Sequence, residues 1–225
     1  MQRIVYRYRK ETPADTLSQS DLRAAFLQAI TLAALPVGEG RRGVLMGPSL
    51  PTGATSDAEQ AVIELLTPCE PSEVCRALNL HLPAGVRIER AWIARPGKTD
   101  ENPASLDESV YDVLWHNAPD SDLFTERVQQ FLAASEVCFT RIRVKKTQQL
   151  NARAFVHRVE LLAYREGVAR VRMTISVGPQ GTIHPGELLD VLGFSPQSGG
   201  IQIHRVALQR AAWRHPSPPR GGRRT

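Results

Sequence analysis

Cysteines, aromatic residues and long apolar runs are all scarce in this chain, and each scarcity excludes a class of protein. Three cysteines in 225 residues are too few for a disulfide scaffold, and Cys69 and Cys75 lack the two-residue spacing of a zinc knuckle. The six histidines show neither an HxH nor an HExxH pattern. The sequence therefore predicts free thiols in a reducing compartment and no bound metal, flavin or other cofactor.

Apolar runs are short throughout the chain. No stretch reaches the roughly 18 apolar residues of a membrane span, so we expect no membrane partner. The N-terminal segment MQRIVYRYRK carries charges where a signal peptide needs an apolar core. These two features favour a cytoplasmic protein, and 42% hydrophobic with 23% charged residues is ordinary for a globular domain.

Charge is divided unevenly along the chain. Residues 1–136 hold 13 Lys and Arg against 19 Asp and Glu, a balance of −6, whereas residues 137–225 hold 15 against 4, a balance of +11. Two explanations are open. The basic part binds a polyanion such as RNA, or it docks on the acidic part.

Hydrophobic periodicity predicts four helices and nine strands. The helices are expected at 20–35, 71–82, 121–135 and 185–192, and the strands at 4–9, 44–46, 60–66, 86–94, 111–115, 138–145, 155–164, 169–177 and 201–210. Read loosely, each half then follows the order β-α-β-β-α-β, which is the split βαβ plan. We expect an α+β protein of two tandem ferredoxin-like units. The alternative is one larger α+β sheet with helices on one face.

The predicted boundaries divide the chain into four parts. Residues 1–95 form the first ferredoxin-like unit, which contains the GPSLPTG loop, and residues 96–109 form a polar linker with proline. Residues 110–212 form the second, basic ferredoxin-like unit. Residues 213–225 are rich in arginine and proline, which predicts a disordered tail.

An unusual loop precedes the strand predicted at 60–66. Its turn residues are Gly47, Pro48, Pro51 and Gly53. A loop packed by glycines can bring backbone N–H groups close to a ligand. The candidates for a polar pocket beside it are Asp21, Ser56, Asp57 and Glu59. The structural alternative is that Asp21 or its neighbour Ser20 caps the first helix and that Glu59 fixes the turn.

The segment Gly47-Pro48-Ser49-Leu50-Pro51, followed by Gly53, Ser56 and Glu59, resembles the signature of the radical SAM-linked proteins. This is an uncharacterised bacterial family, domain of unknown function 2344, whose members are encoded beside or fused to a radical SAM enzyme. The resemblance extends over residues 6–210 and implies a radical SAM enzyme as partner. The cysteine triplet that binds a radical SAM cluster is missing, so we expect this chain to perform no radical chemistry itself.

Two basic strands carry the candidates for nucleic-acid binding. The candidate cations are Arg141, Arg143, Lys145, Lys146, Arg170 and Arg172. Alternation places most of them on one face of a sheet, where they could follow a phosphate backbone. The alternatives are a solvated face and a docking surface for the acidic part.

These observations lead to one functional hypothesis and two alternatives. We expect an accessory protein without catalytic activity of its own, which presents an RNA substrate (tRNA or rRNA) to a radical SAM enzyme. The first alternative is an RNA-modifying enzyme with its pocket at the GPSLPTGATSDAE segment. The second is a purely structural interaction module.

Overall fold

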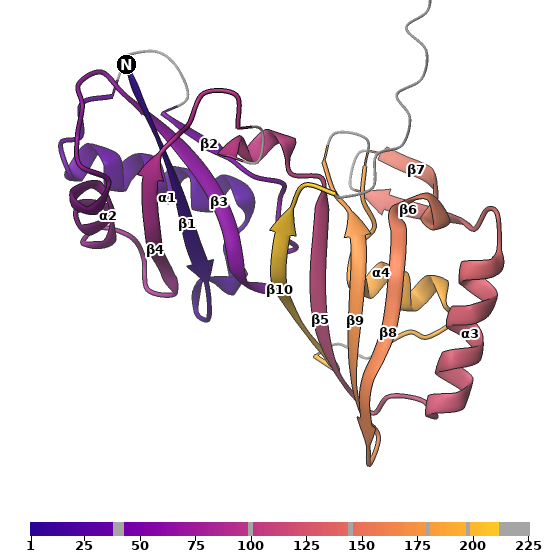
Figure 1. The fold of residues 1–225 in the computed structure, drawn as a ribbon. Helices are drawn as coiled ribbons and strands as arrows, with labels where there is room; N and C mark the ends of the chain where they lie inside the picture. Colours follow the sequence, from indigo (N-terminus) through magenta and orange to yellow (C-terminus); the bar gives the residue numbers. More distant parts are fainter. Residues whose placement is uncertain (38–42, 99–100, 144–145, 179–180, 197–198, 212–225) are drawn as a thin grey trace, which may run out of the picture.

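The protein is a mixed α+β structure with one large sheet and four helices in its described part (Figure 1). The computed structural model describes residues 1–37, 43–98, 101–143, 146–178, 181–196 and 199–211. Eight strands form the main sheet in the order β4-β1-β3-β10-β5-β9-β8, with β2 paired to β3 beside this path. Strands β6 and β7 form a separate two-stranded sheet.

The first half of the chain supplies four strands and two helices. These are β1 (Gln2–Lys10), α1 (Gln19–Leu32), β2 (Val44–Met46), β3 (Thr55–Leu65), α2 (Pro71–Asn79) and β4 (Val86–Ile93), with the short 3-10 helix η1 (Ala14–Thr16) after β1. The strands lie in the order β4-β1-β3-β2 and every pair is antiparallel. The first helix begins with a capping box between Ser18 and Asp21, which satisfies backbone N–H groups at its first turn.

The second half repeats this arrangement with an insertion. Its elements are η3 (Pro103–Ser105), β5 (Glu108–His116), α3 (Ser121–Ala133), β6 (Cys138–Arg143), β7 (Lys146–Asn151), η4 (Ala152–Phe155), β8 (Val156–Arg165), β9 (Val168–Ser176), α4 (Pro185–Val191) and β10 (Ile201–Gln209). Strands β10-β5-β9-β8 are neighbours in that order, and all three pairs are antiparallel. The β6–β7 hairpin is inserted between α3 and β8.

One long strand joins the two halves into a single sheet. The C-terminal part of β3 pairs with β2, and its N-terminal end pairs in parallel with β10, where Thr55 faces His204 and Ser56 faces Arg205. Both neighbours therefore lie along the same edge of β3, one after the other. Because this parallel contact spans only two residue pairs, side chains must contribute to holding the halves together.

The helices cover one side of the sheet and leave the other side open. In the first half, Phe26 of α1 and Val74 of α2 share a buried core with Tyr6 of β1. In the second half, Phe124 of α3 and Leu188 of α4 share a core with the inward side chains of β5 and β9. Figure 1 is viewed onto the side without helices. We call this side the open face.

Three expectations about the elements need correction. Strand β3 starts at Thr55, not at residue 60, so Ser56, Asp57 and Glu59 lie in a strand and not in a loop. The strand predicted at 138–145 belongs to the separate β6–β7 hairpin and not to the main sheet. The predicted linker is partly packed, because Glu101 and Leu106 are buried. The predicted tail, residues 213–225, lies outside the described residues.

Candidate functional site

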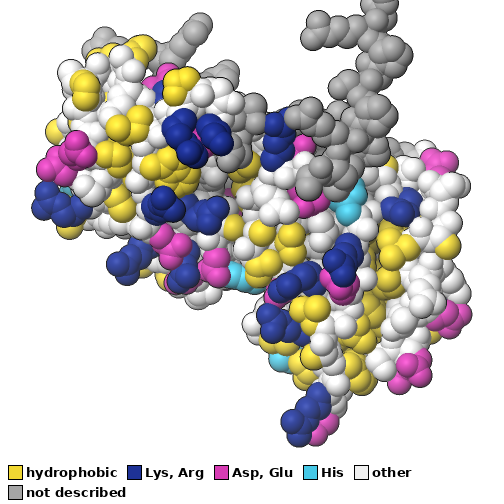
Figure 2. All heavy atoms as spheres, viewed as in Figure 1, with side chains coloured by type: hydrophobic (Ala, Val, Ile, Leu, Met, Phe, Trp, Pro, Cys, Tyr) yellow, Lys and Arg dark blue, Asp and Glu magenta, His cyan; other side chains and the backbone are white. Residues whose placement is uncertain are grey.

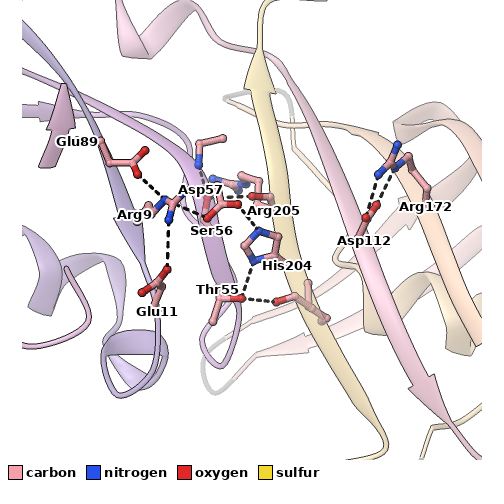
Figure 3. Close-up of polar contacts among 12 residues, drawn as sticks. Arg9, Glu11, Thr55, Ser56, Asp57, Glu89, Asp112, Arg172, His204 and Arg205 are labelled. Carbon is pink, nitrogen blue, oxygen red and sulfur yellow. Dashed lines mark hydrogen bonds and ion pairs between the residues drawn. The ribbon is translucent and has the colours of Figure 1, made fainter. Parts of the chain in front are cut away.

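A buried arginine occupies the junction between the two halves. Arg205 of β10 has no exposed surface, and its guanidinium donates to a carboxylate, a phenol and two backbone carbonyls. These acceptors are Glu59 Oε1 at 2.9 Å, Tyr111 Oη at 2.8 Å, Pro48 O at 3.1 Å and Ser49 O at 2.8 Å. Figure 3 labels Arg205 beside Ser56 and His204. The acceptors come from both halves, so this one side chain connects them.

The loop at residues 47–53 supplies two of those acceptors, which gives its unusual composition a structural reason. A side chain at position 47 would approach Leu208 to 3.2 Å and the carbonyl of Gln60 to 3.3 Å. Gly53 has φ +86°, which glycine adopts without strain. The glycines thus allow the loop to pass close to the sheet and to direct its carbonyls at Arg205.

The electrostatics of the junction are those of a closed network. Burial alone would lower the pKa of Arg205, but the charge of Glu59 and the Tyr111 hydroxyl raise it above its ordinary value. Burial also raises the pKa of Tyr8, and the charge of Glu59 adds to this effect. Since Glu59 is 2% exposed and bonded to Arg205, it cannot reach a substrate as a general acid or base must.

The other polar-pocket candidates lie elsewhere. Ser56 is buried and donates to the carbonyl of Arg205 at 3.3 Å. Asp57 lies 3.1 Å from His204 Nε2 and 3.4 Å from Arg9 Nε, in a half-exposed ion network (Figure 3). Asp21 belongs to the capping box at the start of α1, where its carboxylate accepts from the backbone N–H and the hydroxyl of Ser18. The N-cap itself is Ser18, and neither Ser20 nor Asp21. The structure therefore does not bring the four candidates together in one pocket.

The predicted basic strands do not share one face. Arg141 of β6 donates to both carboxylate oxygens of Glu187 in α4, and its side chain is 9% exposed. It serves to fasten the hairpin to the helix, since the Glu187 carboxylate and the Thr182 carbonyl occupy its donors. Arg143 and Lys146 lie in β6 and β7, away from the main sheet. Lys145 lies outside the described residues.

Arg170 and Arg172 of β9 do point to the open face. Both bind Asp112 of β5, with Arg170 Nη2 at 2.7 Å from Oδ2 and Arg172 Nε at 2.7 Å from Oδ1 (Figure 3 labels the second pair). The hydrogen bond from Arg172 outweighs the effect of burial and holds the pKa of Asp112 below its ordinary value. Two arginines on one carboxylate leave a net positive charge, and the Arg170 side chain remains 57% exposed.

Arginines also gather on the open face of the first half, which the sequence reasoning missed. Figure 2 shows Lys and Arg side chains over the sheet of both halves. Arg7 of β1 and Arg90 of β4 are exposed and directly opposite each other. A sequence signal existed, because the alternation in IVYRYR assigns Arg7 to the outer face of its strand. The acidic net charge of residues 1–136 obscured it.

Two kinds of site are absent from the described residues. No group of three or more His, Cys, Asp or Glu side chains in them could hold a metal ion. Nor does this part of the chain contain a helix of the length and apolar character that a membrane crossing requires.

The fold and the network at its junction define an α+β protein of two strand–helix repeats joined in one sheet. Residues 3–185 match the family described as uncharacterized proteins conserved in bacteria, DUF2344. The chain belongs to this family. No curated protein matches it.

Solved structures with a similar fold come from larger chains. A chain in a crystal structure of a Cbf5–Nop10–Gar1 complex is 13% identical with a TM-score of 0.52, and the alignment covers 91% of this chain and 48% of that one. A structure of an H/ACA RNP bound to a substrate RNA containing 2'-deoxyuridine gives 11% identity, a TM-score of 0.46, and coverage of 90% and 46%. This chain thus spans about half the length of these structures, and the first likeness is one of fold.

Proposed function

We propose that this chain is an RNA-binding accessory protein that presents its RNA to a radical SAM enzyme and has no catalytic centre of its own. The observation that carries the RNA part is the open face of the sheet, where arginines from both halves lie on the side without helices. Such a surface can follow a phosphate backbone, and Lys and Arg contacts to phosphates supply most of the nonspecific affinity for nucleic acids. The radical SAM partner rests on the resemblance of the segment at residues 47–59.

In this proposal the two halves share one RNA-binding surface. We interpret them as two ferredoxin-like repeats, which the repeated strand order and antiparallel pairing support. The buried Arg205 network keeps both repeats in one sheet, so that their open faces form one continuous surface. A long single strand of RNA could then contact both halves at once.

Salt-dependent RNA binding tests the RNA part. Affinity of a fluorescently labelled single-stranded RNA should fall steeply with salt, with a log–log slope of about −0.7 per phosphate contact. Arg158 and Arg170 of the open face are 68% and 57% exposed, so R158Q/R170Q should weaken binding. A matched control, R76Q/R127Q, removes two exposed charges from helices α2 and α3, on the opposite side of the sheet. Absence of binding by the wild-type protein at low salt would remove the RNA part.

Co-expression tests the partner. The protein and the radical SAM enzyme encoded nearest to it should elute together in size-exclusion chromatography, at a mass that fits a stoichiometric complex. Separate elution at micromolar concentrations, with and without RNA, would remove the partner part and leave the RNA part standing.

A further inference from the structure

A hollow on the open face of the first half combines arginine side chains with an aromatic ring. It has a volume of about 590 Å³ and lies between β1, β4 and the C-terminal end of β10. Its walls include Arg7, Arg90, Trp92 and Arg210, and the segment after β4 closes one side. We call these four residues the arginine groove. None of them was among the candidates that the sequence suggested.

Two arginines of the groove face each other without an acidic partner. Arg7 and Arg90 are direct partners in the antiparallel β1–β4 ladder, so both side chains leave the same face. Like charges at directly opposite positions destabilise a sheet. Among the residues that the structure describes, no carboxylate lies within 4.0 Å of either guanidinium. An arrangement that costs stability in the free protein fits a surface that receives an anion.

A stacking surface lies directly beside these charges. The guanidinium of Arg90 lies 5.6 Å from the ring centroid of Trp92, and Trp92 is half-buried. Two planar groups held in contact provide a surface on which a nucleobase can stack, as in proteins that bind single-stranded nucleic acids. Arginine stacked on an aromatic ring also retains N–H donors for phosphate.

The ring is held in place by the segment that follows β4. Glu101 is 5% exposed and accepts from the backbone N–H of Arg95 at 2.5 Å and from its Nε at 2.7 Å. The same carboxylate hydrogen-bonds the Trp92 side chain. Together these hydrogen bonds hold the pKa of Glu101 below its ordinary value, and the bond from the Arg95 backbone has the largest effect. Trp92 is therefore fixed before any ligand arrives, which reduces the entropy lost on binding.

We propose that the arginine groove binds a short single-stranded segment of RNA, with phosphates on Arg7, Arg90 and Arg210 and one base on the Arg90–Trp92 surface. This proposal rests on the proposed RNA-binding function and assigns it a site. Phosphate contacts supply the salt-dependent affinity, and the stacked base favours a single strand, because bases inside a duplex are already stacked on each other.

The test uses the full-length protein and a fluorescein-labelled decauridylate, with binding followed by fluorescence anisotropy over a range of salt concentrations. R7Q/R90Q should reduce the steepness of the log–log salt dependence by about 1.4, the share of two phosphate contacts. W92L should lower affinity about tenfold, the effect of losing one stacked base, and leave the slope unchanged. The control R76Q/R127Q, on helices α2 and α3, carries the same change in net charge and should reproduce the wild-type slope.

Two further measurements make the test independent of folding defects. R7Q/R90Q should melt at the wild-type temperature or above, because it removes a like-charge contact. Binding of the oligonucleotide should quench tryptophan fluorescence in a W213F variant, and the quenching should be absent from W92L/W213F, because the one tryptophan left in that variant, Trp115, is 4% exposed.

Each outcome decides something different. A wild-type protein that does not bind decauridylate at low salt overturns both the groove and the RNA-binding function. If the wild-type protein binds, but R7Q/R90Q and the control weaken binding equally, the groove is overturned and the RNA-binding function is not. Loss of binding in R7Q/R90Q with full affinity in W92L overturns the stacked base and leaves the phosphate contacts.

Discussion

Replacing the buried arginine at the junction should destabilise the whole protein more than any change at an exposed arginine. Arg205→Met removes the guanidinium while keeping most of the side-chain volume. It leaves the carboxylate of Glu59, which is 2% exposed, without its charge partner. It also leaves the carbonyls of Pro48 and Ser49 without their donor. We expect a loss of about 3 to 5 kcal/mol in the free energy of unfolding, the usual cost of breaking a buried ion pair.

The partner of the ion pair supplies a double-mutant cycle. Glu59→Met alone should cost a similar amount, because it leaves the Arg205 guanidinium buried without a counter-charge. The combined R205M/E59M variant should lose less than the sum of the single changes, since neither buried charge remains. This non-additivity would show that the two groups act as a pair and not as independent packing elements.

Urea unfolding followed by circular dichroism measures all three variants. Arg165→Met is the matched control, because the side chain of Arg165 is 87% exposed and an exposed ion pair contributes only about 0 to 1 kcal/mol. If R205M costs no more than this control, or if the cycle is additive, the assignment of Arg205 as the tie between the halves is refuted.

Three further predictions concern single positions. Gly85→Ala should cost more than about 2 kcal/mol in thermal unfolding, because φ is +84° and the added carbon would lie 2.4 Å from the carbonyl oxygen of Glu11; a melting temperature within a degree of wild type would contradict it. The hydrogen bond from Arg172 holds the pKa of Asp112 below its ordinary value. Its stabilisation is therefore present above the pKa of an unfolded aspartate and is lost as the pH falls through the lowered folded-state value. D112N should thus lose about 1 to 2 kcal/mol at neutral pH and show a weaker dependence of stability on acid; an unchanged acid unfolding profile would count against this. Ser18→Ala should cost about 1 kcal/mol through loss of the α1 cap, measured by urea unfolding, whereas an equal loss on Ser20→Ala would point away from the capping box.

Hydrophobic periodicity located most elements because it is a local property. The spacing of Leu22, Phe26 and Ile30 predicted α1, and these three side chains are buried against the sheet. The strand β7 was missed, because its sequence KTQQLN has no apolar alternation. Its pairing with β6, and not its own composition, makes it a strand. The start of β3 was placed too late for the same reason, since Ser56 and Glu59 are polar residues buried by partners elsewhere in the chain.

The sequence could name some residues of the candidate site, but it could not show which residues contact each other. The sequence singled out Glu59 and the loop at 47–53, but it could not reveal that Arg205, 146 residues away from Glu59, is their partner. Regional net charge was misleading in the same way. It pointed to Arg141, whose donors are occupied by Glu187 and Thr182, and away from Arg7 and Arg90.

By itself the sequence determined the positions of the helices and most strands, the α+β class, and a capped start of the first helix near Asp21, because these depend on residues a few positions apart. The tertiary structure alone decided which charges are paired and which are exposed. Pairing depends on which strands become neighbours, and β3 with β10 or β1 with β4 bring together residues that are far apart in the chain. An arginine is therefore buried at position 205 and exposed at positions 7 and 90 for reasons that no local pattern contains.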